Sequence, residues 1–152
     1  MNLSIKAAFL HLSNFDEMNK IEHIGIAVKN LQEACSIYES LLGISSYKTE
    51  QVDSEGVNTA FFQTGANKIE LLEATHNDSP IAKFLEKRGE GIHHVAFDVD
   101  DIVQEMSRLK AQGFVLLNEE PKVGADHKLV CFVHPKGTKG VLVELCQEIK
   151  NS

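Results

Sequence analysis

The 152-residue sequence predicts an α+β fold in which one βαβββ module occurs twice. The main observation is an internal repeat, because residues 91–101 echo residues 21–30. When His94 is aligned with His23, the apolar residues around the two histidines also match in type. A helix-like segment that stops at a glycine follows each histidine, and a glutamate in a second apolar stretch closes each unit. Each module therefore contributes one histidine and one glutamate at related positions.

The first module begins with a strand at residues 21–28, where β-branched residues alternate. His23 lies on the face opposite the aliphatic row, and alternation places Glu22 on the other face from His23. Asn30 can cap the helix that follows, and Gly43 ends that helix. Three further strands complete the module, at residues 47–52, 57–63 and 68–73.

A short helix at about residues 79–89 links the modules, since it has a serine cap, a proline in its first turn and a glycine stop. The second module then repeats the order of the first. It has a strand at residues 92–99, a cap at Asp100 or Asp101, and a helix that stops at Gly113. Its other strands are expected at residues 114–117, 128–133 and 140–146.

Length and repeat together predict a single domain at residues 18–148. A chain of this length fits one domain of ~100–200 residues, so two half-size modules should share one core. The modules span about residues 21–75 and 91–147, and residues 1–17 form an N-terminal extension outside the repeat.

Composition narrows the class of protein. A net charge of −7 argues against a nucleic-acid surface, which needs clustered lysine and arginine. No apolar run approaches the ~20 residues that span a membrane. Cys35, Cys131 and Cys146 lack metal-knuckle spacing and are interpreted as small core residues of a reducing compartment. We therefore expect a cytoplasmic protein that binds neither nucleic acid nor membrane.

Two glutamates lie on strands that should be half buried. Glu144 shares a strand face with Leu142, and Glu70 lies between two aliphatic residues. A buried carboxylate without a partner is costly, so each should face a cation or strong donors. His23 and His94 are the candidates to share that cation. A mixed nitrogen and oxygen donor set suits Mn, Co, Fe, Ni or Zn.

A lone strand histidine is more often a satisfied core residue than a ligand. Four ligand-type residues at equivalent places in two modules nevertheless favour a metal site. His93 should point to the opposite face from His94 and corresponds to Glu22 in the repeat, so a structural or supporting role is expected. The other histidines are interpreted as loop residues: His11, His76, His127 and His134.

With this repeat and donor set, the chain resembles the vicinal oxygen chelate, or glyoxalase, superfamily over about residues 18–147. Within it, the 78–85 linker, the Glu120-Pro121 loop and the His134-Pro135-Lys136 turn are similar to the methylmalonyl-CoA epimerase family. The resemblance implies two tandem βαβββ modules that form one curved mixed sheet around a divalent metal. It rests on residues 23–28, 78–85, 91–97, 119–124, 134–136 and 140–145.

The resemblance also implies an isomerase that interconverts the (2R) and (2S) forms of methylmalonyl-CoA through an enolate, in propionate metabolism. Glu144 would be one acid/base group as well as a ligand, and the implied partners are an acyl-CoA substrate and a second copy of the chain in a homodimer. The implied cofactor is a divalent ion: Co, Mn, Ni, Zn or Mg. Its ligands would be His23, Glu70, His94 and Glu144. The candidates to bind the CoA phosphates are Lys122, Lys136 and Lys139.

The sequence departs from the superfamily pattern at two positions. Thr59 stands where some members have a glutamate that serves as the second acid/base group, so another group or a water would serve that face. Glu70 stands where some members have glutamine, which adds a negative charge to the site. Two alternative functions are a glyoxalase-type isomerase of a glutathione adduct and a metal-free binding module of the same fold.

Overall fold

The structure is a computed structural model that describes residues 17–151. The predicted extension therefore lies outside the described residues except for Glu17. The strands are β1 (Lys20–Ala27), β2 (Lys48–Val52), β3 (Val57–Thr64), β4 (Asn67–Ala74), β5 (Gly91–Asp98), β6 (Lys122–Val123), β7 (Lys128–Val133) and β8 (Val143–Glu148). The helices are α2 (Leu31–Leu42), α3 (Pro80–Arg88) and α4 (Ile102–Ala111), with a 3-10 turn η2 (Pro135–Thr138).

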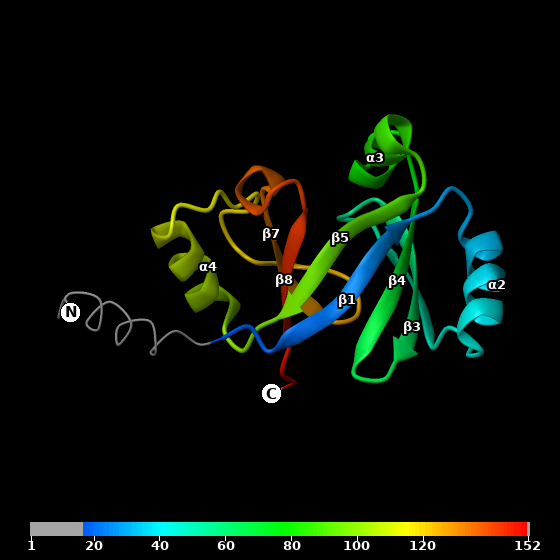
Figure 1. Cartoon of the computed structure of the whole chain (residues 1–152), viewed down its shortest axis with the longest axis horizontal. Helices are drawn as coiled ribbons and strands as arrows, with labels where there is room; N and C mark the ends of the chain where they lie inside the picture. The colour runs from blue at the N-terminus through cyan, green and yellow to red at the C-terminus, as the bar shows by residue number, and fades with distance from the viewer. Residues whose placement is uncertain (1–16, 152) are drawn as a thin grey trace, which may run out of the picture.

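One mixed eight-stranded sheet runs through this part of the chain, in the order β2-β3-β4-β1-β5-β8-β7-β6 (Figure 1). β1 is parallel to β4, and β5 is parallel to β8. The first strands of the two modules, β1 and β5, are antiparallel at the centre of the sheet. The two modules are thus related by an approximate twofold axis between β1 and β5, and the predicted α+β fold with tandem modules is confirmed.

The helix boundaries follow local capping signals. Asn30 Oδ1 accepts the Glu33 amide at 2.9 Å, and Gly43 adopts a left-handed φ of 69° after α2. The cap of α4 is Asp101, one of the two aspartates considered from the sequence, and its Oδ1 accepts the Gln104 amide at 3.0 Å. These boundaries agree with the predicted ones because capping depends on neighbours in sequence.

Each module packs its long helix on the face of the sheet opposite the predicted histidine. Ile26 and Val28 pack against α2, whereas His23 alternates to the other face. In the second module, Cys131 and Leu145 pack against α4. Figure 1 shows these two helices at opposite ends of the sheet, with α3 at one edge of the central strands. One face of the central strands is therefore left for polar side chains.

The predicted strand at residues 114–117 is wrong. The chain makes only a single bridge there, between Leu116 and Val133. Asn118 Oδ1 then accepts the Phe132 amide at 3.0 Å, where a continuing strand would offer a backbone carbonyl. The chain leaves the sheet at this point and returns as the two-residue β6, which pairs with β7. The last strand also differs slightly, since it begins at Val143 and not at residue 140.

The cysteines agree with the expectation of small core residues. Cys131 and Cys146 are fully buried, and the partly buried Cys35 of α2 packs against the cluster that includes Ala60 and Phe62; all three are free thiols. Within residues 17–151, no helix has the length and apolar character needed to cross a membrane.

Candidate active site

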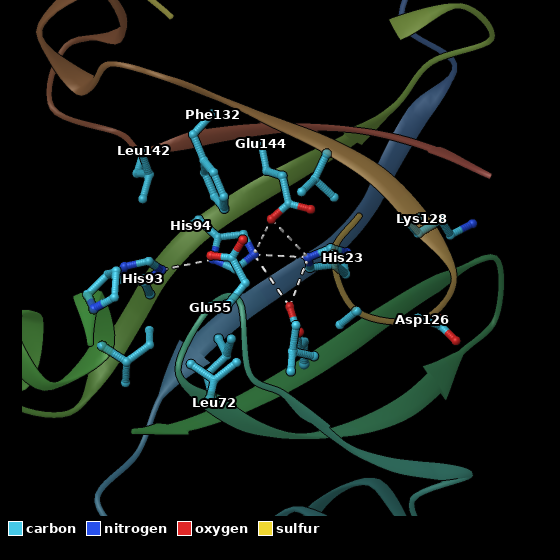
Figure 2. Close-up of a pocket in the computed structure, with 18 of the residues that line it drawn as sticks. His23, Glu55, Leu72, His93, His94, Asp126, Lys128, Phe132, Leu142 and Glu144 are labelled. Carbon is cyan, nitrogen blue, oxygen red and sulfur yellow. Dashed lines mark hydrogen bonds and ion pairs between the residues drawn. The ribbon is translucent and has the colours of Figure 1, made fainter. Parts of the chain in front are cut away.

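Four buried polar side chains converge on one face of the central strands. His23 comes from β1, Glu70 from β4, His94 from β5 and Glu144 from β8, and each exposes 6% or less of its surface. The repeat predicted that these four residues share a cation. The structure brings all four together; Figure 2 labels His23, His94 and Glu144 among them, with dashed lines for their contacts.

The donor atoms have the spacing that a single ion requires. The Nε2 atoms of His23 and His94 are 2.9 Å apart. Glu70 Oε2 lies 3.1 Å from His23 Nε2 and 3.5 Å from His94 Nε2. Glu144 Oε2 lies 3.9 Å and 3.2 Å from the same two atoms. Ligand atoms that bind an ion at about 2.1 Å and at right angles are about 3 Å apart.

The register of the sheet explains why the donors meet. Gly25 of β1 pairs with Glu70 on β4 and with His94 on β5. A Cβ atom on Gly25 would lie 2.1 Å from His94 Cε1, so only glycine lets this imidazole cover the strand. Ala96 holds the equivalent place in the second module.

Two β-bulges turn the neighbours of the histidines toward the site. The pairing of β1 with β5 skips Glu22 on one strand and His93 on the other. An extra residue in a strand breaks the strict alternation of faces and can aim its side chain to the same side as its neighbour. The prediction that Glu22 and His93 face away from His23 and His94 is therefore wrong.

Each of these neighbours contacts the Nδ1 atom of a histidine in the cluster. Glu22 Oε2 lies 2.5 Å from His23 Nδ1, and His93 Nδ1 lies 2.9 Å from His94 Nδ1. An imidazole that donates a proton from Nδ1 presents an Nε2 lone pair. When both histidines are neutral, two such lone pairs face the two carboxylates. This donor set fits a divalent cation.

Burial and charge move the pKa values of the cluster apart. Burial opposes ionisation of Glu70, but hydrogen bonds with the two histidines lower its pKa to about 2. Burial raises the pKa of Glu144, and the charges of Glu70 and Glu55 add to the rise. Burial works against the charged form of His23, yet the hydrogen bonds with Glu22 and Glu70 hold its pKa well above 6.5.

A cavity of about 240 Å³ lies beside the four donors. Its wall is largely apolar, and Figure 2 shows Leu72, Phe132 and Leu142 around the cluster. An apolar wall keeps water out and strengthens electrostatic interactions inside the site. The cavity therefore suits a ligand that places oxygen atoms at the cluster and an alkyl group on the wall.

Of the three lysines predicted to bind phosphate, only Lys122 lines the cavity. Its Nζ atom lies 2.6 Å from Glu55 Oε1 and 5.9 Å from the centre of the Phe132 ring. Lys136 lies in η2 and Lys139 directly follows it, and neither lines the cavity.

Thr59 is fully buried, and its hydroxyl donates to the Glu50 carbonyl at 3.3 Å. A hydroxyl in this position does not take up a proton near neutral pH. Glu55 was not predicted as a site residue, yet it lines the cavity. It lies in the turn between β2 and β3, where no hydrophobic period marks the direction of a side chain.

The loop between β6 and β7 lines one side of the cavity and is anchored on the first module. Asp126 Oδ2 accepts hydrogen bonds from Lys68 Nζ and from the Tyr47 hydroxyl, each at 2.9 Å. Lys68 Nζ also pairs with Glu22 Oε1 at 2.6 Å. A chain of charged contacts thus runs from this loop to His23.

The chain is similar to proteins of known family. Residues 22–132 match the family described as the glyoxalase/bleomycin resistance protein/dioxygenase superfamily. The mitochondrial methylmalonyl-CoA epimerase of Homo sapiens is 40% identical over 86% of this chain and 74% of its own length. The ethylmalonyl-CoA/methylmalonyl-CoA epimerase of Cereibacter sphaeroides is 42% identical over 86% of this chain and 98% of its own.

Solved structures agree with these relatives. A variant of Streptomyces coelicolor methylmalonyl-CoA epimerase, in complex with 2-nitronate-propionyl-CoA, superposes with a TM-score of 0.84 at 34% sequence identity. The match covers 88% of this chain and 100% of that chain.

Proposed function

The chain belongs to the glyoxalase/bleomycin resistance protein/dioxygenase superfamily and within it to the methylmalonyl-CoA epimerases, and we propose that it interconverts (2R)- and (2S)-methylmalonyl-CoA. It is thus an isomerase that acts on an acyl-CoA. The observation that carries the proposal is the convergence of His23, Glu70, His94 and Glu144 beside an apolar cavity.

We propose that these four residues hold a divalent cation. Their donor atoms are buried and close together, with the two Nε2 atoms 2.9 Å apart and Glu144 Oε2 3.9 Å from His23 Nε2. Two imidazoles favour Co, Mn, Ni or Zn over Mg, which prefers oxygen ligands and water. When bound, such a cation supplies Lewis-acid stabilisation of negative charge on the oxygens of the substrate.

Glu144 would act as one acid/base group at the α-carbon. The α-proton of methylmalonyl-CoA lies between a thioester carbonyl and a carboxylate, so its removal gives an enolate. Glu144 lines the cavity from β8, which places its carboxylate beside a substrate bound at the cluster. The apolar wall keeps water from the enolate, so that the proton returns to carbon from a side chain.

The proposal extends to CoA binding, oligomeric state and cellular role. The candidates to bind the CoA phosphates are Lys122, Lys136 and Lys139. We also expect the protein to be a homodimer and to work in the cytoplasm, in propionate metabolism. Light scattering coupled to size-exclusion chromatography would test the dimer. A glyoxalase-type isomerase of a glutathione adduct is less favoured, because the Homo sapiens and Cereibacter sphaeroides relatives that each match 86% of this chain are named as epimerases.

Proton NMR in deuterated water tests the function directly. The metal-loaded protein is expected to remove the α-proton signal of methylmalonyl-CoA and to collapse the methyl doublet. Glu144→Gln should slow both changes by ~10²-fold or more, the usual contribution of a general base. Metal binding of the variant is measured in parallel, since Glu144 is also a proposed ligand. No exchange with the metal-loaded wild type would refute the proposal.

A further inference from the structure

Inversion at a carbon by proton transfer needs an acid/base group on each side of that carbon. Glu144 can serve one side. The residue at the position of the superfamily's second glutamate, Thr59, is fully buried and donates its hydroxyl to the Glu50 carbonyl. The second side therefore needs another group, either a side chain that borders the cavity or a water.

The turn between β2 and β3 holds Glu55 at the cavity. The Glu55 amide donates to the Val52 carbonyl at 3.1 Å, and the Thr75 amide donates to the Gly56 carbonyl at 2.9 Å. Gly56 has a left-handed φ of 64°, and a Cβ atom there would lie 2.7 Å from His76 Nε2. This close packing fixes the turn, so Glu55 is presented by a rigid segment.

The Glu55 carboxylate faces the interior of the site. Figure 2 shows it among the lining residues near His94, whereas Glu144 enters from β8 on another side. Its Oε1 atom is shielded from solvent and lies 2.6 Å from Lys122 Nζ, with which it forms an ion pair. A carboxylate that is shielded from solvent and borders the substrate cavity can exchange a proton with a bound ligand.

We propose that Glu55 is the second acid/base residue, and that it transfers a proton to and from the face of the α-carbon opposite Glu144. The inference rests on the proposed epimerase function. Glu55 belongs to the first module and Glu144 to the second, so each module supplies one carboxylate to the reaction. Lys122 forms an ion pair with the Glu55 carboxylate at 2.6 Å and has no part in the proton transfer.

The proton balance is the same in both directions. With one epimer, the Glu144 carboxylate takes the α-proton, the C–H electron pair moves into the thioester carbonyl to form the enolate, and protonated Glu55 returns a proton to the other face. Glu144 then carries the proton and Glu55 is ionised. This form of the enzyme accepts the opposite epimer, in which Glu55 takes the proton and Glu144 returns one.

Glu55→Gln separates exchange from inversion. In deuterated water the variant should still exchange the α-proton of one epimer through Glu144, without inverting it. The other epimer should neither exchange nor invert. The rate of inversion should fall ~10²-fold or more in both directions. NMR follows exchange, and chiral analysis of the recovered acyl group follows inversion.

Two further variants make the result specific. Lys122→Met removes the ion pair but keeps the Glu55 carboxylate, so the ratio of inversion to exchange should stay near that of the wild type. Glu119→Gln changes an exposed carboxylate outside the cavity and should leave both rates unchanged. Calorimetric titration with Co or Mn should give a similar metal affinity for wild type and Glu55→Gln, because within residues 17–151 the ion pair of Glu55 is with Lys122 and not with any of the four donors.

The outcomes are distinguishable. A wild type that exchanges neither epimer refutes the epimerase function itself. If the wild type is active, then inversion at the normal rate by Glu55→Gln overturns the role of Glu55. Equal loss of exchange for both epimers with normal metal binding, or a Lys122→Met variant with the same face-selective defect, also overturns it, because the ion pair alone would then explain the effect.

Discussion

At the scale of single residues, the partners of His23 and His94 differ although the modules repeat. His23 Nδ1 contacts the Glu22 carboxylate, whereas His94 Nδ1 contacts the neutral imidazole of His93. Burial, followed by the charge of His94, lowers the pKa of His93 to about 4, so His93 is neutral at physiological pH. A carboxylate partner makes an imidazole a stronger ligand. His23 is therefore the stronger donor of the two.

Glu22→Gln should weaken the site without removing a ligand. The amide cannot balance the charge that develops on His23 when it binds a cation, so Co or Mn affinity should fall about 10–100-fold. Calorimetric titration measures the change. Glu50→Gln is a matched control, because Glu50 is a half-buried carboxylate that does not line the cavity. An unchanged affinity in Glu22→Gln would show that the 2.5 Å contact does not tune His23.

Metal affinity should rise with pH through the neutral range. Burial lowers the pKa of His23, but Glu22 and Glu70 hold it well above 6.5, so His23 is protonated in the metal-free protein below that raised pKa. Nε2 must lose its proton before it donates to a cation. Affinity should therefore increase about tenfold per pH unit until the raised pKa is passed.

The proton released on binding can be counted directly. Calorimetric titrations in buffers of different ionisation enthalpy should show about one proton released per ion near neutral pH. The same affinity at about pH 6 and about pH 8 would contradict the expected protonation of His23.

At the scale of the strands, the site depends on departures from a regular sheet. The bulges at Glu22 and His93 bring a supporting side chain beside each histidine, and Gly25 leaves space for the His94 ring. A regular β1–β5 ladder would place both supporting side chains on the face of the helices. The close approach of strand and imidazole therefore sets the geometry of the donors.

Gly25→Ala should disrupt the metal site more than the fold. The new methyl group would lie 2.1 Å from His94 Cε1, so the ring must move away from the cluster. Metal affinity should fall by ~10²-fold or more, because His94 would move out of reach of the metal, which costs more than a change in its basicity. Ala96→Gly, at the equivalent place of the second module, removes a methyl group without a clash and should keep more of the affinity. A Gly25→Ala protein with normal metal binding would contradict this account.

At the scale of the whole molecule, charged contacts join the two modules around the cavity. The loop between β6 and β7 belongs to the second module, and its Asp126 binds Lys68 and Tyr47 of the first. Asp126 is mostly buried, so these contacts are worth more than an exposed ion pair. The loop thereby holds one wall of the cavity in place.

Asp126→Asn should lower the free energy of unfolding by about 1–2 kcal/mol at neutral pH, because a charged acceptor of hydrogen bonds from Tyr47, Lys68 and Lys48 is lost. Burial raises the pKa of Asp126, but Lys68 and Tyr47 outweigh this and lower it below 3.8. The extra stability of the wild type over Asp126→Asn should therefore be fully present above pH 3.8. It should disappear as the pH falls through the lowered pKa of Asp126. Urea denaturation at several pH values measures it. Asp53→Asn, which changes an exposed acceptor of Gln51, should have little effect.

Much of the molecule was predictable from local and periodic signals. The repeat placed His23, Glu70, His94 and Glu144 at related positions, and their elements were found because strand alternation, Asn30, Gly43 and Asp101 act through near neighbours in sequence. The failure at residues 114–117 has the opposite cause. The Asn118 side chain replaces a carbonyl on a strand distant in sequence, and no local pattern marks that replacement.

The sequence by itself determined the two modules, the candidate donors and the family to which they point. Only the tertiary structure decided the positions of Glu22, His93 and Glu55. Two of these depend on bulges in the β1–β5 register, and the third lies in a turn whose direction is set by packing against His76. The physical reason is that the sequence predicts the direction of a side chain only in a regular strand, where successive residues alternate between the two faces of the sheet. Where alternation fails, contacts between segments distant in sequence set the direction.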